Sequence, residues 1–171
     1  MPVRLKAHMA VGAASIADPR SYLQQSGVPM SFKLNPYLRF HGKAKEAMEF
    51  YHGVFGGQLT MTTMGEMQSD LLGPDAERIM HAQLDTDHLT LMASDGFEDA
   101  EPAHTESNVS LALTGTDEAA LRSFWDGLSS DGTVTQPLVD APWGGAFGMV
   151  VDRFGTDWMF NIQPAPTAQR N

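Results

Sequence analysis

The 171-residue sequence contains no cysteine, and this absence removes several kinds of chemistry. Disulfide bonds, thiolate nucleophiles and cysteine-rich zinc sites are all excluded. A chain without cysteine also fits a reducing compartment, so we expect a cytoplasmic protein.

Basic residues are scarce. The chain has 11 Lys and Arg against 21 Asp and Glu, which gives a net charge of −10. Residues 1–33 hold four basic side chains and one acidic one, so the remainder carries −13. An acidic body repels phosphate backbones, and we therefore expect no nucleic-acid partner. Apolar runs are also too short for a membrane helix of roughly 20 residues, which predicts no membrane partner.

The two ends of the chain lack sustained periodicity. We interpret residues 1–33 as an N-terminal tail or arm and residues 164–171 as a C-terminal tail. The segment "AHMAVGAASIA" faintly resembles a signal peptide, but its apolar part is short and contains His8. Met30 stands just before the first strand pattern and is an alternative first residue of the native protein.

From Leu34 onward the sequence repeats itself about every 70 residues. "NPYLRF" at 35–40 matches "NVSLAL" at 108–113, and "EAMEFYHGVFGGQLT" at 46–60 matches "EAALRSFWDGLSSDGTVT" at 118–135. "DTDHLTLMAS" at 85–94 matches "DRFGTDWMFN" at 152–161 at an offset of 67. Such a repeat indicates two copies of one supersecondary unit.

Each copy is predicted to be a βαβββ module. Apolar residues with helical spacing follow the first strand in both copies: Ala47, Phe50, Tyr51, Val54 and Phe55, then Leu121, Phe124, Trp125 and Leu128. Three strand-like runs come next, at 58–66, 79–85 and 88–94, and at 133–139, 146–152 and 157–162. The modules span 34–98 and 107–163, with an acidic connector at 99–106. We expect an α+β fold in which two modules form a curved mixed sheet around a cup, with helices outside.

These segments, in this order, resemble the PhnB-like branch of the vicinal oxygen chelate superfamily, which includes glyoxalase I, extradiol dioxygenases and bleomycin resistance proteins. The resemblance rests on "NPYLRFHGKAKEAMEFYHGVFGG", "HAQL", "LMASD", "NVSLAL" and "PWGGAFGMVVDRFGTDWMFNI" and spans about 34–163. It implies the predicted fold and a homodimer. Some relatives are labelled demethylubiquinone methyltransferases, but this sequence has no glycine-rich strand-to-helix turn for a nucleotide-based methyl donor.

Metal-dependent members of the superfamily bring four ligands together in the cup, commonly two His and two Glu. The resemblance places Asn35, Met92, Asn108 and Met159 at these positions. Amide oxygen is a weak ligand, and thioether sulfur is soft and suits Cu(I) better than Zn, Ni or Fe(II). We therefore expect no metal and no cofactor. The alternative is a metal held by His81 together with Asp95 or Glu66.

Residues 79–94 form a predicted hairpin turning at Thr86-Asp87. Alternation puts Met80, Ala82 and Leu84 on the core face, and Ile79, His81, Gln83 and Asp85 on the polar face. This turn would set His81 opposite Met92 and Asp85 opposite His88. His81 and His88 would lie roughly 13 Å apart along the ladder, too far to share a zinc ion.

The sequence thus predicts a metal-free small-molecule-binding protein of the glyoxalase and bleomycin resistance type. The alternative is a lyase or isomerase that uses His81 as acid or base, or a divalent metal. The predicted ligand-binding residues line the cup: Asn35, Tyr37, Arg39, His81, Met92, Asn108, Trp143 and Met159. Arg39 and His81 favour an anionic or phenolate-like ligand. Tyr37, the two methionines and Trp143 also have ordinary interpretations as packing residues.

Overall fold

The computed structural model describes residues 33–68, 70, 73–96 and 108–165. The chain divides into two units, Met1–Leu34 and Asn35–Asn171. The tail and the acidic connector predicted from the sequence, at 1–33 and 99–106, lie almost wholly outside the described residues, as does most of the predicted C-terminal tail. Within the described residues, no helix has the length and apolar character needed to cross a membrane.

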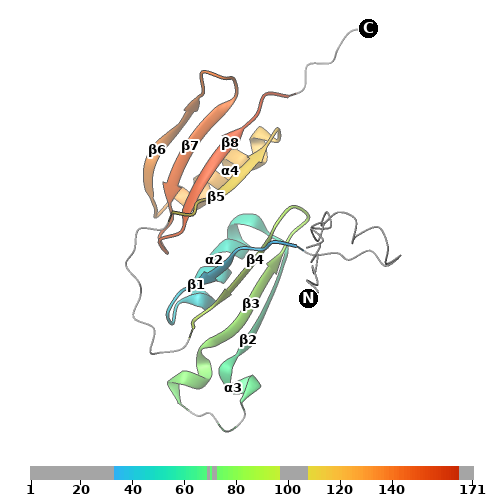
Figure 1. Ribbon diagram of the computed structural model, residues 1–171, viewed down its shortest axis with the longest axis vertical. Helices are drawn as coiled ribbons and strands as arrows, with labels where there is room; N and C mark the ends of the chain where they lie inside the picture. The colour runs from blue at the N-terminus through green and yellow to red at the C-terminus, as the bar shows by residue number, and fades with distance from the viewer. Residues whose placement is uncertain (1–32, 69, 71–72, 97–107, 166–171) are drawn as a thin grey trace, which may run out of the picture. The chain divides into compact units, whose positions relative to one another are not determined.

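Two βαβββ modules follow one another in the second unit, as predicted (Figure 1). The first has β1 (Tyr37–Arg39), α2 (Ala44–Phe55), β2 (Gln58–Thr63), β3 (Ile79–Asp85) and β4 (Thr90–Ser94). The second has β5 (Leu111–Gly115), α4 (Glu118–Ser129), β6 (Thr133–Asp140), β7 (Ala146–Val151) and β8 (Asp157–Ile162). The predicted fold class is confirmed.

The strands form two separate four-stranded mixed sheets, ordered β1-β4-β3-β2 and β5-β8-β7-β6. In each sheet the first strand of the module runs parallel to the last, and the other pairs are antiparallel. The two described sheets do not close into one barrel. One face of each sheet packs on its helix, and the opposite face is left half exposed.

Both helices present the apolar stripe that their spacing predicts. Ala47 and Tyr51 of α2 are fully buried, as is Leu128 of α4. The side chain of Asp117 accepts a hydrogen bond from the backbone N–H of Ala120, so Asp117 is the N-cap of α4. Gly56, with φ of 68°, ends α2, and this left-handed conformation favours glycine.

The strand predicted at 58–66 is longer than the strand in the structure, β2. β2 stops at Thr63 because a capping box begins there: Thr63 Oγ1 accepts from the Glu66 backbone N–H, while the Glu66 carboxylate accepts from the Thr63 N–H. The reciprocal pair starts the short helix α3 (Met64–Met67). A 3₁₀ helix, η1 (Pro74–Glu77), leads from there toward β3.

The face assignment at the start of β3 is also wrong. Ile79 is buried and Met80 is 38% exposed, the reverse of the prediction. Thr62 pairs with His81, but Thr63 pairs with Ile79, so the extra residue on β3 forms a bulge at Met80. A bulge shifts the inside–outside alternation by one residue. Beyond it Ala82 and Leu84 point inward as expected.

Candidate functional site

The half-exposed face of the first sheet carries most of the predicted site residues of the first module. Tyr37 of β1, Met92 of β4, Gln83 of β3 and Thr60 of β2 are register partners in turn across the sheet. Residues in register on neighbouring strands point to the same side. They therefore form one row, which we call the Tyr37 row. It combines a phenol, a thioether, an amide and a hydroxyl.

Tyr37 and His81 are in contact on this face. The Tyr37 hydroxyl lies 3.3 Å from His81 Nδ1, and the ring centroids are 5.8 Å apart. The pair joins β1 to β3 across β4. The hydroxyl and one ring nitrogen thus orient each other. Tyr37 remains 48% exposed, so the pair is accessible to a bound molecule.

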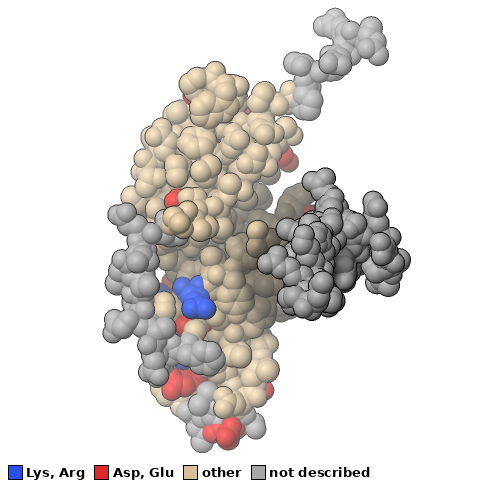
Figure 2. Space-filling model, viewed as in Figure 1, with Lys and Arg blue, Asp and Glu red and all other residues tan. Residues whose placement is uncertain are grey.

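Arg39 supplies positive charge beside the pair. It is exposed, two residues after Tyr37, while Leu38 and Phe40 pack against the core as the strand alternation predicts. Figure 2 shows basic atoms on the surface of the first sheet where Figure 1 places β1. An exposed positive charge on an acidic protein is suited to contact an anionic group.

A cavity of about 380 Å³ opens beside β1. Its walls include Tyr37 and Arg39 on one side and Leu111 and Asp157 of the second module on the other. Ser110 donates a hydrogen bond to Asp157 Oδ2, whereas Oδ1 of the same carboxylate is buried without a hydrogen-bond partner in the described residues. A buried acceptor of this kind would be stabilised by a donor group.

The predicted register of the β3–β4 hairpin is displaced by two residues. Met92 pairs with Gln83 instead of His81, and Asp85 pairs with Thr90 instead of His88. The connection is a four-residue turn, Thr86–Leu89, whose Thr86 hydroxyl accepts from the backbone N–H groups of His88 and Leu89. This side-chain-stabilised turn is longer than the two-residue loop assumed from the sequence. A displacement of two residues preserves the faces, so His81 and Met92 stay on one side.

Asn35 and Asn108 lie before their strands and not within them. β1 begins at Tyr37, and β5 begins at Leu111. The register pairs Met92 with Tyr37, and Met159 with Ala112. Asn35 therefore stands two residues before the partner of Met92, and Asn108 four residues before the partner of Met159. The alignment of Asn35 with Asn108 in the sequence repeat is therefore wrong by two residues, because the register makes Tyr37 equivalent to Ala112.

The open face of the second sheet is more apolar than that of the first. Ala112, Met159, Met149 and Gln136 are register partners in turn across β5, β8, β7 and β6. Trp143, in the β6–β7 turn, is 66% exposed and its ring lies 5.8 Å from that of Phe147. Gln83 and Met149 were not predicted as site residues, although strict alternation along β3 and β7 would have indicated both.

The carboxylates proposed for the alternative metal site already have partners. Asp95 is 2% exposed and accepts backbone N–H bonds from Gly42, Ala44 and Ile79, which fixes the start of α2 to the sheet. The Glu66 carboxylate is engaged in the capping box. Among the described residues, no three His, Asp or Glu side chains are grouped as metal ligands.

A buried polar network that the sequence analysis missed joins the two modules. Tyr51 of α2 donates to Asp152 Oδ2 at 2.7 Å, and its oxygen lies 2.8 Å from Thr156 Oγ1. Trp158 Nε1 donates to the same Asp152 oxygen at 2.8 Å. Burial, and next the Asp152 charge, raise the pKa of Tyr51 well above its ordinary range. Asp152 opens the "DRFG" turn, but nothing local in the sequence identifies a partner 101 residues away.

Sequence comparisons place the chain among known proteins. The family described as 3-demethylubiquinone-9 3-methyltransferase matches residues 32–161. The chain belongs to this family. Protein YjdN of Escherichia coli is 27% identical over 141 residues, which cover 75% of this chain and 94% of YjdN. An uncharacterized protein of Mycobacterium tuberculosis, MT0910, is 30% identical over 145 residues, 79% of each chain.

Solved structures agree with the PhnB-like resemblance. The crystal structure of protein PA1353 from Pseudomonas aeruginosa has 35% sequence identity and a TM-score of 0.68, over 78% of this chain and 99% of that one. A PhnB protein from Bacillus cereus has 26% identity and a TM-score of 0.63, over 77% and 99%. The PhnB-like assignment is confirmed. The family description names a methyltransferase, but membership of a family does not by itself establish an activity, which depends on the residues of the site.

Proposed function

We propose that this protein is a metal-free small-molecule-binding protein of the glyoxalase and bleomycin resistance type. The observation that carries the proposal is the Tyr37–His81 pair, which stands with Arg39 on an accessible sheet face beside a cavity. Accessible pockets with a few placed polar groups are typical of ligand sites.

The ligand we propose is a small anionic or phenolate-like organic molecule. Arg39 provides the charge that would hold an anionic group, and the Tyr37–His81 pair provides hydrogen-bonding atoms. Methionine thioethers adapt to ligands of differing shape, which suits Met92 and Met159. The proposed contacting set remains Asn35, Tyr37, Arg39, His81, Met92, Asn108, Trp143 and Met159.

We also propose that the protein is a cytoplasmic homodimer. Each sheet leaves one face half exposed, and Val139 and Trp143 of the second module are 53% and 66% exposed. A second copy that covers these faces would enclose the ligand and remove apolar surface from water. Sedimentation at micromolar concentration should give twice the mass of one chain, and a single-chain mass would refute this part.

A second candidate function is catalytic. The Tyr37 hydroxyl beside Nδ1 would orient the His81 imidazole, and an oriented imidazole is a general acid or base near neutral pH. This favours a lyase or isomerase that uses His81. The version with a divalent metal is less well supported because Asp95 and Glu66 are engaged by backbone N–H groups.

The decisive experiment identifies the molecule that co-purifies with the protein, by native mass spectrometry followed by release and fragmentation. Affinity for that molecule is then measured in Arg39→Gln and His81→Ala, with His52→Ala, an exposed histidine on α2, as the matched control. We expect Arg39→Gln to weaken binding roughly tenfold and His52→Ala to leave it unchanged.

Turnover separates the two functions. If His81→Ala keeps the affinity and abolishes conversion of the ligand, the catalytic function replaces simple binding. If the wild-type protein contains one equivalent of transition metal, the metal-free proposal is wrong. If Arg39→Gln and His81→Ala bind as tightly as the wild type, the ligand lies elsewhere and the proposed face is wrong.

A further inference from the structure

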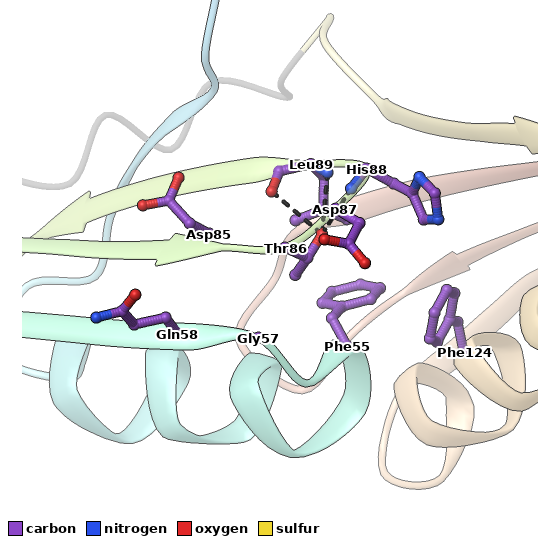
Figure 3. A pocket seen from close by; sticks show the side chains of 9 residues that line it. All are labelled: Phe55, Gly57, Gln58, Asp85, Thr86, Asp87, His88, Leu89 and Phe124. Carbon is purple, nitrogen blue, oxygen red and sulfur yellow. Dashed lines mark hydrogen bonds between the residues drawn. The ribbon is translucent and has the colours of Figure 1, made fainter.

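A second cavity, of about 510 Å³, lies at the turn between β3 and β4 (Figure 3). Its walls come from the C-terminal end of α2, the start of β2, the end of β3, the Thr86–Leu89 turn and Phe124 of α4. The Tyr37–His81 pair does not line it. The lining residues are Phe55, Gly57, Gln58, Asp85, Thr86, Asp87, His88, Leu89 and Phe124.

The internal repeat allows the turn beside this cavity to be compared with its counterpart in the second module. Gln83 pairs with Met92 in the first module and Met149 with Met159 in the second, so Thr86 corresponds to Asp152. Both residues open their turns by accepting two backbone N–H bonds. The two turns therefore begin in the same way, and what differs is the packing beneath them.

In the second module, the space beneath the turn is filled. The second carboxylate oxygen of Asp152 accepts hydrogen bonds from Tyr51 and Trp158. The Tyr51 ring packs edge-on to Trp158 and Phe154. In the first module, Thr86 has no second oxygen, and Leu91 occupies the strand position that corresponds to Trp158. Both side chains have fewer non-hydrogen atoms than their counterparts in the second module, and Thr86 lines an open space beside the turn.

The open space has the chemistry of a cation site. Phe55 and Phe124 form its floor, with ring centroids 5.1 Å apart and planes at 68°. In Figure 3 the Asp87 carboxylate points from the turn toward the Phe55 ring, whereas the Asp85 side chain points away. Aromatic faces attract cations, and a carboxylate adds direct charge attraction.

Two further features favour a positive ligand. α2 ends at Phe55, and the carboxyl end of a 12-residue helix carries partial negative charge. The nine lining residues include two carboxylates and no Lys or Arg. An anion would be repelled by the Asp87 carboxylate and by the carboxyl end of α2, and a neutral molecule would gain only the apolar contact.

We propose that this cavity binds a small organic cation that carries an aromatic or compact apolar group. The apolar group lies on Phe55 and Phe124, and the ammonium lies beside Asp87. This site is separate from the sheet face proposed above, and neither proposal depends on the other.

The test uses phenethylammonium as the probe, with 2-phenylethanol and 3-phenylpropionate as neutral and anionic counterparts of similar shape. Amide chemical shifts of the full-length protein are followed by NMR during titration. We expect phenethylammonium to shift the amides of Phe55, Gly57 and the Thr86–Leu89 turn at millimolar concentration. The neutral analogue should bind at least about threefold more weakly, and the anion should not bind.

Asp87→Asn is the sharpest variant because the exposed side chain keeps its shape and loses only its charge. It should weaken the probe roughly threefold to tenfold. Asp126→Asn is the matched control, since it removes one exposed carboxylate from α4 without touching the cavity. Leu89→Phe, which fills the cavity from the turn, should abolish binding. Melting temperatures verify that all three variants are folded.

Three results would overturn the proposal. The first is equal binding of 2-phenylethanol, which would make the cavity an apolar cleft without charge selectivity. The second is an equal loss of affinity in Asp126→Asn and Asp87→Asn, which would reflect only the net charge of the protein. The third is a set of shifts centred on Tyr37 and His81, which would put the cation on the sheet face instead.

Discussion

Tyr51→Phe should reveal how much the buried network contributes to stability. The substitution keeps the ring, which is fully buried, and removes the hydroxyl that donates to Asp152 at 2.7 Å. A hydrogen bond to a charged group contributes about 1.5–3 kcal/mol, and among the described residues the Asp152 oxygen would keep Trp158 alone as a partner. We therefore expect the free energy of unfolding to fall by about 1.5–3 kcal/mol at pH 8.

The pH dependence provides a second, independent signature. The pKa of Tyr51 is raised in the folded state from an ordinary value of 10.0, so the folded protein holds this proton more tightly than the unfolded chain does. This contribution is fully present below pH 10 and is lost as the pH rises from there toward the raised pKa. At pH 11 the loss amounts to about 1.4 kcal/mol for one proton. The gap between wild type and Tyr51→Phe should shrink by that amount.

Urea denaturation followed by circular dichroism at pH 8 and pH 11 measures both quantities. Tyr37→Phe is the matched control, because its hydroxyl is on an exposed residue and should contribute less than about 0.5 kcal/mol. An unchanged stability in Tyr51→Phe at pH 8 would show that the network contributes little. An equal gap at both pH values would show that Tyr51 does not titrate as its burial implies.

Two backbone anchors give further predictions. Asp95→Ala removes the acceptor of three backbone N–H groups, of which those of Ala44 and Ile79 are buried. It should cost roughly 3 kcal/mol or more, against about 1 kcal/mol for Asp117→Ala at the exposed cap of α4. Equal losses in thermal melts would contradict this ranking. Gly145→Ala should cost more than about 2 kcal/mol because φ is +74° and the new Cβ would overlap the carbonyl oxygen of Ile162. Gly155→Ala, with φ of +85° and open space around it, should cost only about 1–2 kcal/mol, so similar melting temperatures for the two variants would be the contrary outcome.

The sequence by itself determined the architecture of this protein. The 70-residue repeat, the helical stripes and the alternation within β1, β4 and β8 predicted two βαβββ modules, because these signals are local and are set by which side chains must be buried. The N-cap Asp117 and the helix-ending Gly56 are also local features, since each acts through contacts within a few residues. The faces of Tyr37, Arg39, His81 and Met92 followed from the same alternation.

The tertiary structure alone decided how residues on different elements meet. The Met80 bulge and the two-residue displacement of the β3–β4 hairpin depend on strand pairing and turn geometry, which short-range patterns do not encode. The Tyr37–His81 contact spans 44 residues and the Tyr51–Asp152 bond spans 101. Such pairs form only when packing brings distant segments together. The cavity beside Phe55 depends on tertiary packing in the same way, because its walls combine residues of α2, the β3–β4 turn and α4.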